Sequence, residues 1–175
     1  MELKELTDRT CEIFGCSTVQ ELGNQLMLCV ADNNTEKIKT FHDLVEDLRI
    51  DWLQKIFQYY QADRKEKMQD YTPKSLAYFV GMLAGDSGTV IDMCAGSGAL
   101  TIQKWNQNNN TRFVLYEFDE KVIPFLLFNM MLRNIECTVY HADVLQNEIF
   151  HTYKVSRGDR YGVFKEVQNG NITNF

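Results

Sequence analysis

The sequence predicts an α/β fold: a partial parallel sheet, preceded by a helical region and followed by a β-hairpin. Two observations support this prediction. Between residues 73 and 141, apolar strand patterns alternate with helical patterns, which is typical of parallel strands joined by right-handed crossovers. The first strand runs into a glycine-rich turn, Asp92 to Gly98, that opens a helix. Such a turn lies at the carboxyl end of its strand, where parallel sheets bind ligands.

Length and composition favour a folded protein. The chain has 175 residues, of which 45% are hydrophobic and 12% aromatic, with only two prolines, so it can bury a core. Its formal net charge of −6 argues against unaided binding to duplex DNA, because Lys and Arg must neutralise the phosphates. No signal-like or membrane-spanning run is present. Five cysteines without a Cys-x-x-Cys pair indicate a reduced, cytoplasmic setting and no metal site.

Residues 1–68 form the expected helical N-terminal region. Apolar residues three to four positions apart predict three helices, Leu3 to Phe14, Thr18 to Val30 and Phe41 to Tyr60. Gly15 is expected to end the first helix, and the polar stretch 32–35 predicts a loop and a helix start. We expect the apolar face of the 41–60 helix to pack against the sheet domain.

Residues 69–175 form the expected sheet domain. The pattern predicts, in order, a helix from Ser75 to Leu83, a strand from Thr89 to Asp92, a helix from Ala99 to Trp105, a strand from Phe113 to Glu117, a helix from Asp119 to Asn134 and a strand from Cys137 to His141. Residues 153–155 and 161–167 then predict a β-hairpin around a glycine-containing loop. This hairpin, 153–167, is expected to cap the sheet or to pair with a protein partner or a second copy.

The glycine-rich turn predicts a nucleotide site. Gly96 and Gly98 leave the backbone open to a ligand, and the helix that starts near Ala99 directs free N–H groups toward an anionic group. Glu117 ends the second strand, where a carboxylate can accept hydrogen bonds from both ribose hydroxyls of an adenosine ligand. Similar turns also arise from packing alone, so the neighbouring segments decide between the two interpretations.

Four short segments follow one another in a recognisable order. They are Tyr71-Thr72-Pro73, the turn Asp-x-x-x-Gly-Ser-Gly from Asp92 to Gly98, Tyr116-Glu117-Phe118-Asp119 and Ala142-Asp143-Val144. With these segments, residues 69–144 resemble the S-adenosylmethionine-dependent N6-adenine DNA methyltransferases, especially the modification subunits of type I restriction systems. The resemblance implies a Rossmann-like sheet with S-adenosylmethionine (SAM) as the cofactor.

The resemblance also implies roles for individual residues. Thr72 would contact the methionine carboxylate, the turn would wrap the methionine and ribose, Glu117 would hold the ribose hydroxyls, and Asp143 would accept from the adenine amino group. The implied cofactor-binding residues are Tyr71, Thr72, Asp92, Cys94, Ala95, Gly96, Ser97, Gly98, Glu117, Phe118, Asp143 and Val144. Simpler roles remain open, because Thr72 and Asp119 can cap helices, Asp143 can form a turn and Cys94 can fill packing space.

The sequence departs from this family at the target base. The enzymes carry an Asn- or Asp-Pro-Pro-Tyr or -Phe segment that grips the flipped adenine, whereas the only prolines here are Pro73 and Pro124. Catalytic residues therefore stay unassigned. Two hypotheses remain: a methyltransferase part of a restriction-modification or mobile-element system, completed by another chain or segment, and a non-catalytic, cofactor-binding regulator or subunit. Under either hypothesis, we expect the chain to bind DNA only weakly or through a partner.

Overall fold

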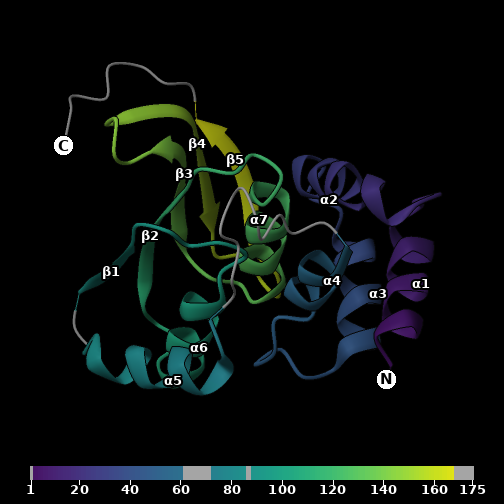
Figure 1. Cartoon of the computed structure of the whole chain (residues 1–175), viewed down its shortest axis with the longest axis horizontal. Coiled ribbons are helices and arrows are strands. Elements are labelled where there is room, and N and C mark those ends of the chain that lie inside the picture. The colour runs from purple at the N-terminus through teal and green to yellow at the C-terminus, as the bar shows by residue number, and fades with distance from the viewer. Residues whose placement is uncertain (1, 61–71, 86–87, 168–175) are drawn as a thin grey trace.

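The computed structural model describes residues 2–60, 72–85 and 88–167. The helices are α1 (Leu3–Phe14), η1 (Val19–Glu21), α2 (Leu22–Ala31), α3 (Thr35–Val45), α4 (Trp52–Tyr60), α5 (Lys74–Leu83), α6 (Ala99–Gln107) and α7 (Ile123–Leu132). The strands are β1 (Thr89–Asp92), β2 (Arg112–Glu117), β3 (Cys137–Asp143), β4 (Glu148–Ser156) and β5 (Val163–Val167). Figure 1 shows α7 between the sheet and the N-terminal helices, with α5 and α6 together near β1.

The first helix ends where the sequence predicts. Gly15 follows α1 with a left-handed φ of +78°, and its N–H donates to the carbonyl of Cys11. The predicted start of α3 is also confirmed, because the Asn34 side chain accepts from the N–H of Lys37 at 3.1 Å. The second helix begins later than predicted, since η1 forms a short 3₁₀ turn ahead of α2.

The prediction of one helix from Phe41 to Tyr60 is wrong. The chain forms two helices, α3 and α4, separated by residues 46–51. Glu46 takes a left-handed φ of +56° directly after α3. Asp51 then opens α4 by accepting the N–H of Gln54 at 2.9 Å. The apolar spacing continues across the break, so the periodicity alone did not reveal it.

The sheet has the strand order β1-β2-β3-β4-β5. Its first three strands are parallel, whereas β4 runs antiparallel to β3 and β5 antiparallel to β4. Strand β4 begins at Glu148, earlier than predicted, and pairs along β3 as far as Cys137. The alternation of parallel strands and helices therefore stops after β3, and the sheet continues through direct antiparallel neighbours.

Helix α7 begins later than predicted. Asp119 does not cap it, because Val122 occupies the N-cap position and the Asp119 carboxylate accepts from the N–H of Lys121 at 3.2 Å. Pro124 lies in the first turn of α7, where its missing N–H costs nothing. The predicted N-cap role of Asp119 is therefore corrected to a turn that precedes the helix.

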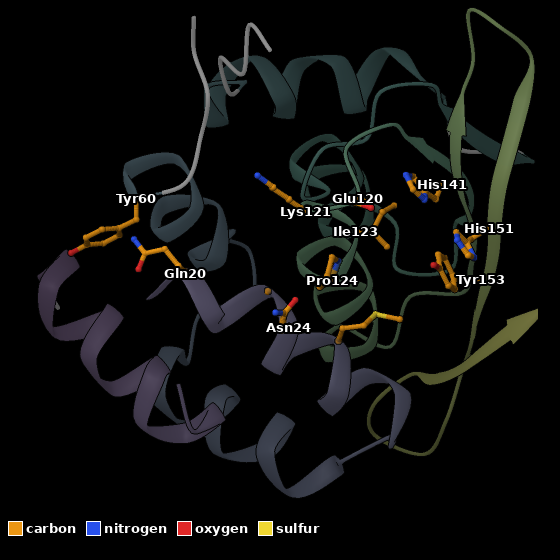
Figure 2. Close-up of a pocket in the computed structure, with 12 residues that line it drawn as sticks. Gln20, Asn24, Tyr60, Glu120, Lys121, Ile123, Pro124, His141, His151 and Tyr153 are labelled. Atoms are coloured by element: carbon orange, nitrogen blue, oxygen red, sulfur yellow. The ribbon is translucent and has the colours of Figure 1, made fainter. Parts of the chain in front are cut away.

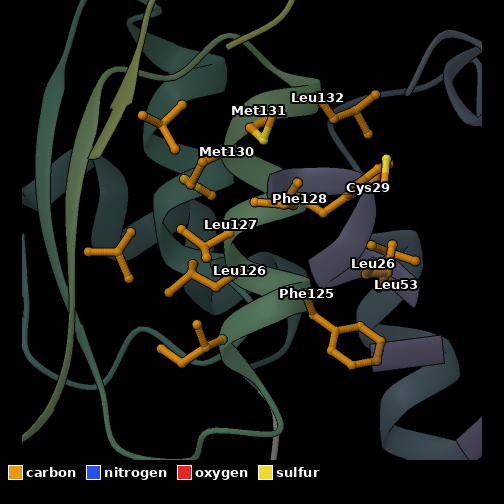
Figure 3. Close-up of a cluster of buried hydrophobic side chains, with 14 of the residues drawn as sticks. Leu26, Cys29, Leu53, Phe125, Leu126, Leu127, Phe128, Met130, Met131 and Leu132 are labelled. Atoms are coloured by element: carbon orange, nitrogen blue, oxygen red, sulfur yellow. The ribbon is translucent and has the colours of Figure 1, made fainter. Parts of the chain in front are cut away.

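Helix α7 joins the two parts of the chain into one core. All its residues are buried (Figure 3). On the side of the N-terminal helices, the ring of Phe128 lies 5.2 Å from that of Phe14 and 5.4 Å from that of Phe41, measured between centroids. Phe57 and Phe125 meet in the same way at 5.1 Å. The predicted packing of the 41–60 apolar face is thus confirmed, with α7 between it and the sheet.

The predicted boundary between the two domains, at 68/69, lies outside the described residues, so it stays a prediction. Among the residues that are described, no helix is both long enough and apolar enough to cross a membrane.

Candidate cofactor site

Three carboxylates mark the same edge of the sheet. Asp92, Glu117 and Asp143 are the last residues of β1, β2 and β3. Because these strands are parallel, their carboxyl ends share one edge, and residues 93–98 connect β1 to α6 there. This is the edge at which α/β sheets bind nucleotide-like ligands.

The two glycines of the turn are needed for different reasons. Gly98 has a φ of +99°, and a Cβ there would lie 2.8 Å from Cε of Met130 and 3.1 Å from Cδ1 of Leu126. It therefore allows the turn to pack against α7. Gly96 has a φ of +55°, but a Cβ there would meet no atom within 4 Å. The space beside Gly96 is open, as the backbone approach of a ligand requires.

Glu117 fixes the position of the glycine turn. Its Oε2 accepts the N–H of Gly96 at 2.8 Å, and its Oε1 accepts the N–H of Asp119 at 2.8 Å. Burial raises the pKa of this carboxyl, and the two backbone N–H groups partly oppose the rise. Each carboxylate oxygen has a further lone pair, so Glu117 can hold the turn and still accept from a ligand hydroxyl.

Asp92 has an unsatisfied oxygen at the same edge. Its Oδ1 accepts the N–H of Cys94 at 3.1 Å, whereas Oδ2 is buried and has no hydrogen-bond partner among the described residues. Burial raises the pKa of Asp92. Since buried acceptors rarely stay unpaired, the site suits a ligand that brings a donor or a positive charge, as the ammonium of a methionine tail does.

Asp143 and its neighbours form the third corner of the site. The Oδ1 of Asp143 accepts the N–H groups of Leu145 and Gln146, both at 3.0 Å, so its turn role is present. Val144 is half-buried. Phe118 extends from the end of β2 with 61% of its surface exposed, and an exposed aromatic face at this edge can stack on a base.

The sequence matches a known family over most of its length. The family model for N-6 DNA methylases matches residues 46–159. The chain belongs to the N-6 DNA methylase family. No curated protein and no solved structure gives a match. The matched range contains the three strand-ending carboxylates and the glycine turn, and it begins ahead of Asp51 in the N-terminal region.

Not every residue predicted for the cofactor site lies together with the others. Thr72 precedes α5 and lines a cavity of about 440 Å³ that includes none of the three strand-ending carboxylates. Its other walls come from the turn before α4, including Asp51, and from α4 and α6, including Gln103. Tyr71 lies outside the described residues. Ala95 is buried, and its N–H donates to the carbonyl of Tyr116 at 2.8 Å. That bond joins the turn to β2.

Cys94 is corrected from a packing residue to an exposed one. Its side chain lies on the surface of the glycine turn. Although the residue is exposed as a whole, partial burial of its thiol, together with the charges of Glu117 and Asp92, raises its pKa, which favours the unreactive thiol form. No group of three or more His, Cys, Asp or Glu residues suited to a metal ion occurs within the described ranges.

A buried polar network was missed by sequence reasoning. The Oδ2 of Asp51 accepts from the Oγ of Ser97 at 2.7 Å, and its Oδ1 accepts from the Nδ2 of Asn129 at 3.0 Å. The same Nδ2 donates to the carbonyl of Ser97 at 2.9 Å. The network therefore holds both the hydroxyl and the carbonyl of Ser97, so the N-terminal region positions the glycine turn.

Arg133 extends this network toward the turn between α3 and α4. Its Nε and Nη2 donate to the carbonyls of Leu48 and Ile50 at 2.7 and 2.8 Å, and its Nη1 donates to the Oδ1 of Asn129 at 2.8 Å. Burial lowers the pKa of Arg133 to about 10, and the charge of Asp51 opposes that shift. The sequence signal for Asp51 was a possible N-cap before Trp52, hidden within the supposed long helix.

A cavity of about 720 Å³ lies beside the predicted site (Figure 2). His141 on its wall pairs with Glu117 in the sheet, and its Nε2 lies 3.1 Å from the carbonyl oxygen of Phe118. It lies between α2, the start of α7 and the strands β3 and β4. The rings of His141 and His151 stack on its wall with centroids 5.7 Å apart, and Tyr153 continues the row. Burial lowers the pKa of His141. None of the predicted cofactor residues lines this cavity. Despite its size, the cavity is therefore not the site that the sequence predicts for the cofactor.

Proposed function

We propose that this chain is a SAM-binding member of the N-6 DNA methylase family, with a Rossmann-like cofactor site, acting in the cytoplasm as part of a restriction-modification or mobile-element system. The observation that carries the proposal is the buried Oδ2 of Asp92, which has no hydrogen-bond partner within the described ranges and lies beside an open glycine turn. The family match supports the same cofactor class. The described residues fit SAM, because its donors and positive charges complement the carboxylates at this edge.

In this proposal, different residues of the chain contact different parts of the cofactor. Asp92 would accept from the methionine ammonium, Glu117 from the ribose hydroxyls and Asp143 from the adenine amino group, with Phe118 and Val144 against the adenine ring. Gly96 would let the backbone approach the ligand. When bound, SAM supplies an electrophilic methyl group on its sulfonium.

Binding is better supported than transfer. Methyl transfer to adenine needs the amine held in line with the sulfonium, and the Asn-Pro-Pro-Tyr segment that does this in the family is absent from the sequence. Beyond β3, the described chain forms β4 and β5, which pair antiparallel. We therefore propose a non-catalytic regulator or inactive subunit, with DNA bound weakly or through a partner. A methyltransferase part completed by another chain is the second candidate.

Replacing Glu117 with alanine is expected to weaken SAM binding by roughly 1.5 to 3 kcal/mol, the value of hydrogen bonds to a charged group. Two effects contribute, because the variant loses the ribose acceptor and also releases the N–H of Gly96. Calorimetric titration with SAM and with S-adenosylhomocysteine measures the loss. The wild-type titration itself tests the cofactor proposal.

Glu136→Ala is the matched control for this experiment. Glu136 is also a half-buried glutamate, but it directly precedes β3, at the opposite end of the strand from Asp143. It should leave SAM affinity unchanged. Equal affinities of wild type and Glu117→Ala would remove Glu117 from the site, and no heat of binding in the wild type would reject SAM as the ligand.

The isolated chain is expected not to methylate adenine, because it lacks the residues that would position and polarise the amine. The assay incubates the purified chain with tritiated SAM and with mixed-sequence DNA, both single- and double-stranded. A known adenine methyltransferase in the same buffer serves as the positive control. Protein-dependent label in N6-methyladenine would contradict the non-catalytic proposal and show a catalytic segment within 144–175.

A further inference from the structure

Helix α5 exposes an apolar stripe that nothing in the described chain covers. Leu76, Phe79, Val80 and Leu83 are 50%, 51%, 38% and 70% exposed. Their spacing of three, four and seven positions places them on one face of the helix. Solvent-exposed side chains in this pattern are typical of a helix face that packs against another element.

The opposite side of α5 holds it to the protein. Ala77 and Gly81 are buried there, and α5 packs against α6. A Cβ at Gly81 would lie 2.9 Å from Nε2 of Gln107, which donates to the carbonyl of Tyr78 at 2.8 Å. This close contact fixes the orientation of α5, so the stripe faces away from its support.

Strand β1 adds a free sheet edge near this helix. Among the described strands, β1 pairs with β2 alone and ends the sheet. Ile91 in β1 and Met93 directly after it are 61% and 52% exposed. An edge strand with exposed apolar side chains and unpaired backbone groups favours the addition of another strand.

We propose that α5 and the β1 edge form a two-fold interface between two copies of this chain. In such a dimer the stripe of α5 packs against the same stripe of the second copy, and the two β1 strands meet antiparallel. A two-fold axis requires each patch to be complementary to itself. A continuous apolar stripe meets this requirement without any change in the fold.

Charge and area favour a second copy as the occupant. No charged residue occurs from Ser75 to Leu83, although the chain carries a net charge of −6, so the α5 helices of two copies can meet without placing like charges of this segment face to face. The stripe, with Ile91 and Met93, exposes on the order of 600 Å² if a fully exposed large side chain offers about 180 Å². A specific interface needs about 800 Å² on each partner, and paired β1 edges would add the remainder.

The other edge of the sheet is less suited to this contact. Strand β5 exposes Val163 and Val167, but Lys165 and Glu166 are exposed on the same short strand. Charged side chains protect edge strands from pairing. The dimer is therefore assigned to α5 and β1 rather than to the 153–167 hairpin, which supplies a control.

The test is the mass of the full chain in solution, measured by sedimentation between about 1 and 100 μM, the range over which transient and stable dimers differ. We expect a dimer of the 20.4 kDa chain that grows no further, and a monomer for Phe79→Asp and for Leu83→Asp. Val163→Asp, an equally drastic change on the hairpin, should remain dimeric. Circular dichroism checks that each variant is folded.

A second measurement needs no substitution. Amide hydrogen exchange of the wild type should slow in α5 and β1 as the protein concentration rises, while exchange in β5 stays unchanged. A monomer at the highest concentration, open-ended association, or a dimer lost in Val163→Asp and kept in Leu83→Asp would each overturn the proposal. None of these measurements requires SAM, so the dimer and the proposed function are tested separately.

Discussion

Asp51→Ala is expected to lower the free energy of unfolding by about 3 to 5 kcal/mol, the range observed when one member of a buried ionic network is removed. Asp51 accepts from the backbone of Gln54, from Ser97 and from Asn129. The alanine variant leaves these donors unpaired and takes the nearby negative charge from buried Arg133. Urea unfolding followed by circular dichroism measures the change.

Asp43→Ala is the control for that measurement. Asp43 pairs with Lys39 on the surface of α3, with about half of each side chain exposed, and exposed pairs of this kind contribute less than about 1 kcal/mol. Asp51→Asn keeps one acceptor oxygen and should fall between wild type and alanine. If Asp51→Ala were no less stable than Asp43→Ala, the network would not hold the fold together.

Gly96→Val is expected to reduce SAM affinity at least about 100-fold, which corresponds to about 2.7 kcal/mol. The positive φ of Gly96 strains any branched residue, and the new side chain would occupy the open space beside the turn. The N–H of Gly96 would also shift away from Glu117, whose Oε2 accepts it at 2.8 Å. Calorimetric titration of the folded variant with SAM gives the affinity.

Gly15→Val separates backbone strain from loss of the site. Gly15 has a φ of +78°, and a Cβ there would also meet nothing within 4 Å, but it lies at the end of α1. Both variants should lose stability from strain, while only Gly96→Val should lose affinity. Normal SAM binding by folded Gly96→Val protein would show that the glycine turn is not the cofactor site.

The sequence located the sheet edge well because its signals are local. Each parallel strand is short and apolar and ends in a carboxylate, and the glycine turn directly follows the first of them. Parallel connections then place Asp92, Glu117 and Asp143 at one edge without further information. The order of these segments also predicted the N-6 DNA methylase family, which the family match confirms.

The helical region shows where local patterns fail. The apolar spacing of 41–60 fits one helix, yet residues 46–51 turn so that two backbone carbonyls meet Arg133, 83 and 85 positions away along the chain. The same turn brings Asp51 within hydrogen-bond distance of Ser97, which is 46 positions away along the chain. Hydrogen bonds to a buried cation outweigh the continuation of a helix. The spacing of apolar residues along the sequence does not indicate such distant partners.

By itself, the sequence determined the alternating strands and helices, the carboxylates at the strand ends, the glycine turn and the absence of an Asn-Pro-Pro-Tyr segment. The tertiary structure decided that Thr72 faces a different cavity, that Asp51 and Asn129 hold the turn, and that α5 leaves an apolar face exposed. The division follows from distance along the chain. Neighbouring residues set backbone conformation through sterics and hydrogen bonding, whereas burial and pairing depend on residues that only folding brings together.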